Sequence, residues 1–331
     1  LDLGRGDAKE GWSRGFDHYV SNFKALLSAT KDIPLCVFID KSIEQIVWDI
    51  RQKENTQVVY HSKDQFKPPF FPFFDSIQKI RSTPEWYNQA GWLKDSTQGS
   101  MEWYNPMVMS KMFLLHNAKV FNFFNTDYLF WIDGGLTNTV HPGYFSHDRV
   151  IEKIEEIVKK FLFVCFPYET ETEIHGFNID GMKKFANSEK VDRVARGGFF
   201  GGHKEYISGA NELYYSLLRD SLEQGFMGTE ESIFTLMTYL QPDIYEHETI
   251  NGDGLISTFF EKVKNGQTAL ERKSNNRKKA NNNNTILYIN TFNSPEQLQM
   301  VIDSFEEHDK SFLNKTQKYL INNRSEEHTS E

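Results

Sequence analysis

Short runs of consecutive apolar residues alternate along this chain with segments whose apolar residues recur at helical spacing. The runs include "IPLCVFID" (33–40), "YLFWID" (128–133) and "FLFVCFP" (161–167). Strands that are apolar throughout are typical of parallel sheets, because the connecting helices cover both faces of the sheet. The alternation therefore predicts an α/β fold whose mostly parallel sheet is flanked by helices.

Apolar spacing and turn residues give the expected elements between these runs. Helices are predicted over 16–27, 43–50, 150–161, 206–222 and 229–240, and a further strand at "TQVVYHS" (56–62). Asn105 is a suitable N-cap for a helix whose first residue is Pro106. This helix leads directly to the strand that ends at Asp133.

The composition changes after the helical and strand pattern ends. The first domain is expected over 1–264, and 265–284 carries almost no apolar residues, which is typical of a linker. A strand and a capped helix in 285–323 predict the truncated start of a second α/β domain. Residues 324–331 ("RSEEHTSE") resemble a translated sequencing-library adapter, and "LDLGRG" reads as the exit of a strand. Both ends therefore suggest a metagenomic fragment with an incomplete N-terminal strand.

Asp133 stands where a buried strand ends, followed by Gly134 and Gly135. Ligands of such sheets bind beyond the carboxyl ends of the strands. A carboxylate there can hold a divalent cation, and glycines let a phosphate approach the backbone. The alternative is an ordinary turn, which Asp133 starts and in which the glycines supply positive φ angles.

A glycine-rich stretch precedes the expected helix over 206–222. It reads "RGGFFGG" and offers a floor that a sugar ring could approach, from Gly197, Gly198, Phe199, Gly201 and Gly202. The alternative is a glycine-rich β-bulge or bend. The glycine spacing does not match the dinucleotide-binding fingerprint.

Two adjacent carboxylates, Glu230 and Glu231, follow Thr229 in "GFMGTEESIF". Acidic residues in the first turn of a helix interact favourably with its dipole, so a purely structural role is one interpretation. The other is that one of them projects into a cleft as a base.

Scattered cationic and imidazole groups are weaker candidates. Arg5 and Lys111 can neutralise a diphosphate, or each can be a solvated charge. His203 and His247 can bind a cation, although an isolated histidine is more often a surface or hydrogen-bonded residue. We retain Asp133 and His247 as candidate metal ligands.

An aromatic stretch over 63–104 shows little periodicity. Its aromatic content argues against disorder, so the segment is expected to pack beside the Asp133 cleft as a lid. Trp92 and Trp103 would then contact an acceptor, because indole rings offer a sugar an apolar face and a polar edge. The alternative is a hydrophobic plug that touches no ligand.

Charge and cysteine content limit the partners and the compartment. The net charge of −9 argues against a nucleic-acid partner. The two cysteines, Cys36 and Cys165, lie in apolar runs, which fits a reducing compartment. No stretch is long and apolar enough to be a transmembrane segment. A cytoplasmic protein, or one peripheral at the inner membrane face, is expected.

Five motifs in this order resemble the HtrL/YibB family (also written WlaTC/HtrL), whose members are regarded as glycosyltransferases: "LDLGRGD", "YNPMVMSKMFLL", "FNTDYLFWIDGG", "RGGFFGG" and "GTEESIF". The resemblance covers about residues 1–255. It implies a GT-A-like fold in which an Asp-X-Asp signature binds a nucleotide sugar through Mn²⁺ or Mg²⁺. This chain retains only the first carboxylate, Asp133. The resemblance also implies that "GGFFGG" lines the sugar site and that Glu230 or Glu231 lies near the acceptor.

The function predicted from these observations is glycosyl transfer from a nucleotide-diphosphate sugar donor to a glycan acceptor. Asp133 would anchor the cation and Glu231 would be the base. One alternative is a noncatalytic carbohydrate- or nucleotide-binding module with an aromatic cleft from 70–74, Trp86, Trp92 and Trp103. A nucleotidyltransferase is the other, since it needs the same strand-end carboxylate.

Overall fold

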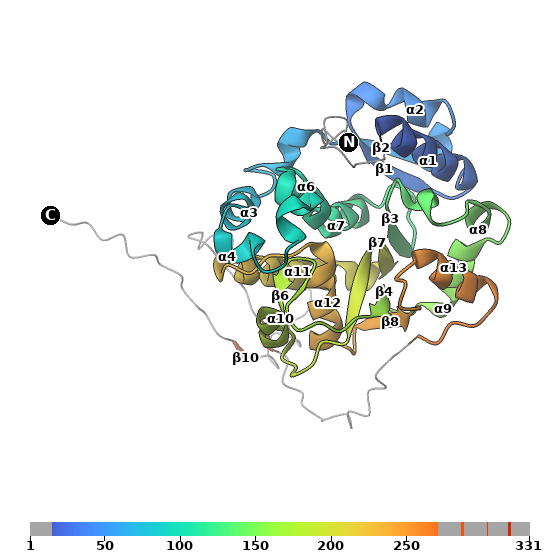
Figure 1. The fold of residues 1–331 in the computed structure, drawn as a ribbon. Coiled ribbons are helices and arrows are strands. Elements are labelled where there is room, and N and C mark those ends of the chain that lie inside the picture. Colours follow the sequence, from blue (N-terminus) through green and yellow to red (C-terminus); the bar gives the residue numbers. More distant parts are fainter. Residues whose placement is uncertain (1–14, 271–285, 288–302, 304–316, 319–331) are drawn as a thin grey trace. The chain divides into compact units, whose positions relative to one another are not determined.

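The computed structural model describes residues 15–270, 286–287, 303 and 317–318 (Figure 1). The chain divides into two compact units, Leu1–Lys273 and Ser274–Glu331. In the second unit, β9 (Ile286–Leu287) pairs in parallel with β10 (Gln317–Lys318). Most of the expected linker, most of the expected second domain and all of 324–331 lie outside the described residues.

The elements of the first unit have the following bounds. Its α-helices are α1 (Phe16–Ala29), α2 (Gln45–Trp48), α3 (Phe74–Arg81), α4 (Pro84–Tyr87), α5 (Thr97–Ser100), α6 (Tyr104–Met109), α7 (Lys111–Phe121), α8 (Gly143–Ser146), α9 (Val150–Ile157), α10 (Ile179–Ala186), α11 (Lys204–Glu223), α12 (Glu230–Leu240) and α13 (Ile256–Lys264). Its strands are β1 (Leu35–Ile39), β2 (Thr56–Tyr60), β3 (Tyr128–Ile132), β4 (Phe161–Pro167), β5 (Glu173–Ile174), β6 (Phe177–Asn178), β7 (Arg193–His203) and β8 (Tyr245–Thr249).

The central sheet is mixed, with the strand order β3-β7-β4-β8. β7 is antiparallel to both of its neighbours, and within this sheet only β4 and β8 pair in parallel. The prediction of a mostly parallel sheet is therefore wrong, although the α/β class is confirmed. The prediction failed because an apolar run indicates only that both faces of a strand are buried. An antiparallel strand covered by helices on both faces is equally apolar.

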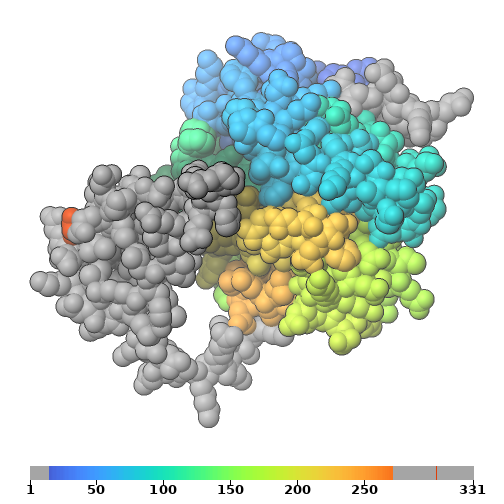
Figure 2. All heavy atoms as spheres, turned by 90° about the vertical axis from the view of Figure 1, so that its left-hand side faces the viewer, coloured from blue at the N-terminus to red at the C-terminus, as the bar shows by residue number. Residues whose placement is uncertain are grey.

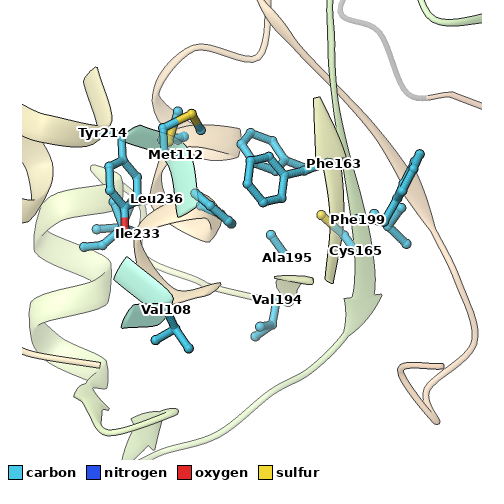
Figure 3. Close-up of a cluster of buried hydrophobic side chains, with 14 of the residues drawn as sticks. Val108, Met112, Phe163, Cys165, Val194, Ala195, Phe199, Tyr214, Ile233 and Leu236 are labelled. Atoms are coloured by element: carbon cyan, nitrogen blue, oxygen red, sulfur yellow. The ribbon is translucent and has the colours of Figure 1, made fainter. Parts of the chain in front are cut away.

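Side chains of β7 alternate between two helical layers. Phe200 faces α12, where its ring centroid lies 4.6 Å from that of Phe234. The preceding Phe199 faces α13 and lies 5.1 Å from Phe260. Successive strand residues point to opposite faces, so this one strand holds both layers together. Figures 1 and 3 show α11 and α12 on one side of the sheet and Phe199 on the other.

The core on the two sides of the sheet draws side chains from many elements. Figure 3 shows this cluster, with labelled side chains from α6, α7, β4, β7, α11 and α12: Val108, Met112, Phe163, Cys165, Val194, Ala195, Phe199, Tyr214, Ile233 and Leu236. Tyr214 is fully buried, and its hydroxyl donates to the carbonyl of Met109 at 2.9 Å. The cluster fixes the starts of α7 and α12 relative to β7, and the candidate site lies at those starts.

A smaller layer stands beside the central sheet. β1 and β2 pair in parallel, apart from the central sheet, and pack with α1 and α2 around Leu27, Val37, Ile39 and Val47. The parallel pairing expected for these two runs is thus present, but in a separate two-stranded sheet.

The segment over 63–104 is more regular than its sequence suggests. It contains α3, α4 and α5, and Trp86 is buried with its indole N–H donating to the carbonyl of Met227 at 2.8 Å. In Figure 2 its light-blue and cyan residues lie next to the yellow α11, which α3 contacts. The segment packs onto the domain outside the sheet, whereas its role as a lid stays a prediction.

The helix expected to start at Pro106 begins two residues earlier and is divided in two. Tyr104 starts α6, so Asn105 lies inside the first turn with a buried side chain. Pro106 permits this start because the first-turn N–H groups have no intrahelical partner. The helix breaks at Ser110, and α7 starts at Lys111.

The helix α9 ends earlier than expected: it stops at Ile157, because Phe161 already begins β4.

A membrane-spanning helix, which needs both length and apolar composition, does not occur in the part of the chain that the structure describes.

Candidate functional site

A cavity of about 790 Å³ opens at the end of β3, where Asp133 emerges. Its walls come from α1, from the ends of β1 and β2, from α5 to α7, and from the first turn of α12. Lys111, Asp133, Glu230 and Glu231 all line it. The structure therefore brings together four of the residues that the sequence singled out separately.

Lys111 lies at the centre of this cluster. Its Nζ donates to Asp133 Oδ2 at 2.9 Å, to Glu230 Oε1 at 2.8 Å and to the carbonyl of Gly197 at 3.1 Å. These bonds use all three donors of the ammonium group. Lys111 is therefore a buried link between two carboxylates and not a solvated charge, whereas its role toward a diphosphate stays a prediction.

Each member of the cluster stands at the end of an element. Lys111 is the first residue of α7, Asp133 follows β3, and Glu230 is the first residue of α12. Asp133 Oδ1 also accepts a hydrogen bond of 2.6 Å from the indole N–H of Trp131. Gly197 makes room for the cluster, because a Cβ at that position would lie 2.2 Å from Glu230 Oε1.

Glu231 has a different set of partners on the same cavity wall. Its Oε2 lies 2.9 Å from His175 Nδ1 and 3.2 Å from Arg196 Nη1, and its Oε1 accepts from the backbone N–H of Gly197 at 2.8 Å. Both carboxylates of the expected pair thus face the cavity, but each is held by its own set of partners.

These surroundings move the two carboxyl groups in opposite directions. Burial raises the pKa of Glu230, and Lys111 only partly offsets this because it is shared with Asp133. Burial also acts on Glu231, but the hydrogen bond from His175, the Arg196 charge and the Gly197 N–H outweigh it and lower its pKa to about 2. Burial lowers the pKa of His175, but its bond to Glu231 reverses this and raises it.

The lowered pKa of Glu231 predicts a pH-dependent contribution to stability. A depressed carboxyl pKa stabilises the folded state above the unfolded value of 4.5, and this contribution is lost as pH falls from about 4.5 to about 2. The shift corresponds to roughly 3 kcal/mol. We expect urea unfolding of Glu231→Gln to show a smaller loss of stability across this window than the unsubstituted protein. Parallel curves for the two proteins would contradict the assignment.

The glycines of "RGGFFGG" have two different structural roles. Gly197 and Gly198 lie at the cluster, where the carbonyl of Gly198 accepts from the Asp133 N–H at 3.0 Å. Phe199 is buried in the core. Gly201 and Gly202 let neighbouring strands approach, since added Cβ atoms would lie 2.3 Å from the Leu129 carbonyl and 2.0 Å from that of Lys160. The register shift between β4 and β7 in this region matches the alternative of a glycine-rich bulge.

The turn after Asp133 does not depend on left-handed glycines. Its carbonyl accepts from the N–H of Leu136 at 2.9 Å, so Asp133 does start a turn. Gly134 and Gly135 have no positive φ angle and instead lie under the rings of Phe23 and Tyr19 of α1, which a Cβ would meet at 3.3 and 3.6 Å. Both glycines line the cavity.

The residues expected to hold a cation do not converge. His247 lies on β8, and β7 and β4 separate that strand from β3, a distance of roughly 14 Å at the usual strand spacing. His203 instead caps α11. Across 15–270 and the short stretches described beyond it, no three His, Cys, Asp or Glu side chains are grouped as metal ligands would be. The side chains of this cluster therefore do not fit a resident divalent cation while Lys111 holds its place.

Four residues that line the cavity carry polar atoms without a partner. Arg196 Nε, Thr229 Oγ1, Gln98 Oε1 and His61 Nε2 are buried without a hydrogen-bond partner. Buried polar atoms in native proteins are nearly always paired, by protein, water or ligand. The protein itself thus leaves polar atoms unpaired beside the cavity.

The two tryptophans expected at the acceptor side separate. Trp92 lines the cavity, is 48% exposed and donates its indole N–H to Glu173 Oε1 at 3.2 Å. Trp103 is not among the lining residues; its ring packs 5.2 Å from Phe74 and under the ammonium group of Lys67 at 4.5 Å. Arg5 lies outside the described residues.

Sequence reasoning missed three residues of this site: Trp131, His175 and Arg196. Trp131 stands two residues before Asp133, on the same side of the strand, so period-2 alternation could have indicated it. Arg196 directly precedes the first glycine pair. His175 lies in a turn after β5 with a φ of 51°, and no sequence pattern links it to Glu231.

Comparison with known proteins gives one match. A family model described as "Bacterial protein of unknown function (HtrL_YibB)" matches residues 1–260. No curated protein and no solved structure matches the chain.

Proposed function

Because the chain belongs to the HtrL_YibB family, whose function is not known, we propose its function from the site: it transfers a sugar from a nucleotide-diphosphate donor to a glycan acceptor. The observation that carries this proposal is the convergence of Asp133, Glu230 and Glu231 on one cavity. A binding module has no need of two adjacent buried glutamates whose pKa values are shifted in opposite directions, whereas such groups are characteristic of active sites. The GT-A-like fold that the family resemblance implies is part of this proposal.

The two glutamates have different parts in the proposed reaction. A general base works best when its pKa is near the working pH, which favours Glu230 over Glu231. Only Oε1 of Glu230 bonds Lys111, so Oε2 would take the proton of the acceptor hydroxyl. This assignment replaces Glu231 as the base, because the low pKa of Glu231 makes it a weak one.

The leaving diphosphate needs positive charge. Arg196 uses Nη1 on Glu231 and its side chain is 31% exposed, so its remaining guanidinium N–H groups can donate to phosphate oxygens while Glu231 keeps it in place. In the proposed displacement the bond from the sugar C1 to the diphosphate breaks as the acceptor oxygen bonds C1. The apolar wall from α1, β1 and α6 would hold the nucleotide and exclude water.

The direct test is turnover of a panel of nucleotide-diphosphate sugars, each with and without a glycan acceptor, by the protein and by Arg196→Gln. We expect at least one donor to be hydrolysed slowly and transferred faster when acceptor is present, with turnover reduced in the variant. Donor binding without any turnover would instead favour the noncatalytic binding module. Absence of both binding and turnover across the panel would contradict the proposal.

Trp92 and Trp103 allow a matched test of the acceptor side. Trp92→Ala is expected to raise the acceptor KM roughly tenfold, about 1.4 kcal/mol, while donor hydrolysis is unchanged. Trp103→Ala is the control, because its ring packs away from the cavity and its loss should lower Tm without changing the acceptor KM. Equal effects of the two substitutions on the acceptor KM would show that Trp92 does not contact the acceptor.

A further inference from the structure

Three oxygen atoms from three elements converge on one point of the site. Asp133 Oδ2, Glu230 Oε1 and the carbonyl oxygen of Gly197 surround Lys111 Nζ at 2.8 to 3.1 Å. We call these three oxygens the oxygen cage. Carboxylate and carbonyl oxygens are the ligands that hard divalent cations prefer. The cage thus has the chemistry of a cation site, and a covalently attached ammonium group fills it.

The charge balance of the cage depends on that ammonium group. Two carboxylates share a single positive charge, and the side chains of Lys111 and Glu230 are only 9% and 5% exposed, whereas that of Asp133 is 37% exposed. Removing Lys111 would leave the buried charge of Glu230 uncompensated. A divalent ion would balance the two carboxylates fully, but it needs oxygens at about 2.0 to 2.1 Å in the case of Mg²⁺ and cannot share the cage with Lys111.

We propose that Lys111 is a built-in cation that occupies the position of a divalent metal ion, so that the protein neither binds nor needs a metal ion at Asp133. Lys111 acts as a positioning residue: it holds the carboxylates of Asp133 and Glu230 in fixed places beside the cavity. The absence of metal binding at Asp133 can be tested without knowledge of the reaction. The expectation that sugar transfer is insensitive to chelators rests on the proposed function.

The first experiment titrates Mn²⁺ into the protein and into Asp133→Asn, with free Mn²⁺ followed by electron paramagnetic resonance. We expect no difference between the two proteins up to about 1 mM Mn²⁺, the weak end of the range for protein oxygen sites. A single site in the unsubstituted protein that disappears in Asp133→Asn would overturn the proposal. This experiment needs no substitution at Lys111. It therefore tests the absence of metal binding even if variants at Lys111 do not fold.

The second experiment empties the cage. Lys111→Ala is expected to gain one Mn²⁺ site at least tenfold tighter than any binding by the unsubstituted protein, and its Tm should rise as Mn²⁺ is added. Lys111→Ala/Glu230→Gln should lose the gained site. Lys119→Ala removes another lysine of α7, one that donates to Ser208, and should gain nothing. A folded Lys111→Ala that binds Mn²⁺ no better than the unsubstituted protein would show that the three oxygens are not a cation cage.

The third measurement separates this inference from the proposed function. If a donor sugar is turned over, addition of a chelator should leave the rate within twofold. Loss of turnover that Mn²⁺ restores would overturn the inference while supporting the reaction. If no donor is turned over, the binding experiments still test the oxygen cage.

Discussion

Replacing Lys111 by Met is expected to lower the free energy of unfolding by about 3 to 5 kcal/mol, because it leaves the buried Glu230 carboxylate and the partly exposed Asp133 carboxylate without their shared cation. Met keeps most of the length of the side chain, so the loss reflects charge more than volume. Urea unfolding at pH 7 measures it. The position matters more than the residue type, since the same substitution at Lys119, whose ammonium group donates to a serine, should cost less than about 1 kcal/mol.

A double variant identifies the cause. Lys111→Met/Glu230→Gln removes the cation and one of its carboxylates together, so it should recover part of the lost stability, and the two single changes should be non-additive by at least about 1 kcal/mol. Strict additivity would mean that the ion pair does not stabilise the folded state. A small effect of Lys111→Met alone would mean that water also reaches the Glu230 carboxylate in solution.

Glu230→Gln is expected to reduce sugar transfer by roughly 10² to 10⁴-fold with little change in donor binding, because the amide cannot accept the acceptor proton. Glu231→Gln should instead act on positioning: it releases Arg196 and His175 and should raise the donor KM. Steady-state kinetics with both substrates distinguishes a fall in kcat from a rise in KM. A larger fall in kcat for Glu231→Gln than for Glu230→Gln would return the role of base to Glu231.

The pH profile gives the same assignment an independent check. A base must be deprotonated to act, so the acid limb of kcat/KM reports the pKa of Glu230 in the free enzyme. Burial raises that pKa above 4.5, and the rate should therefore begin to fall at a pH above that of an ordinary glutamate. An acid limb near pH 2 would point to Glu231 instead.

Local pattern was enough to place several parts of the site. Asp133 could be located because an apolar run followed by a carboxylate and glycines marks the end of a buried strand. Glu230 and Glu231 could be located because the start of an amphipathic helix is a local signal around Thr229. The expected strand end and helix start are both observed, since such boundaries depend on neighbours in the chain.

Strand direction, ionisation and contacts between distant residues were decided only by tertiary structure. β7 runs antiparallel although its sequence shows only that both of its faces are buried. Lys111 meets Asp133 and Glu230, residues 22 and 119 positions away, because α7 packs on β3, and β3 and α12 both pack on β7. The pKa values of two adjacent glutamates diverge for the same reason: burial and the charges of distant residues set them, and neither is encoded in the local sequence.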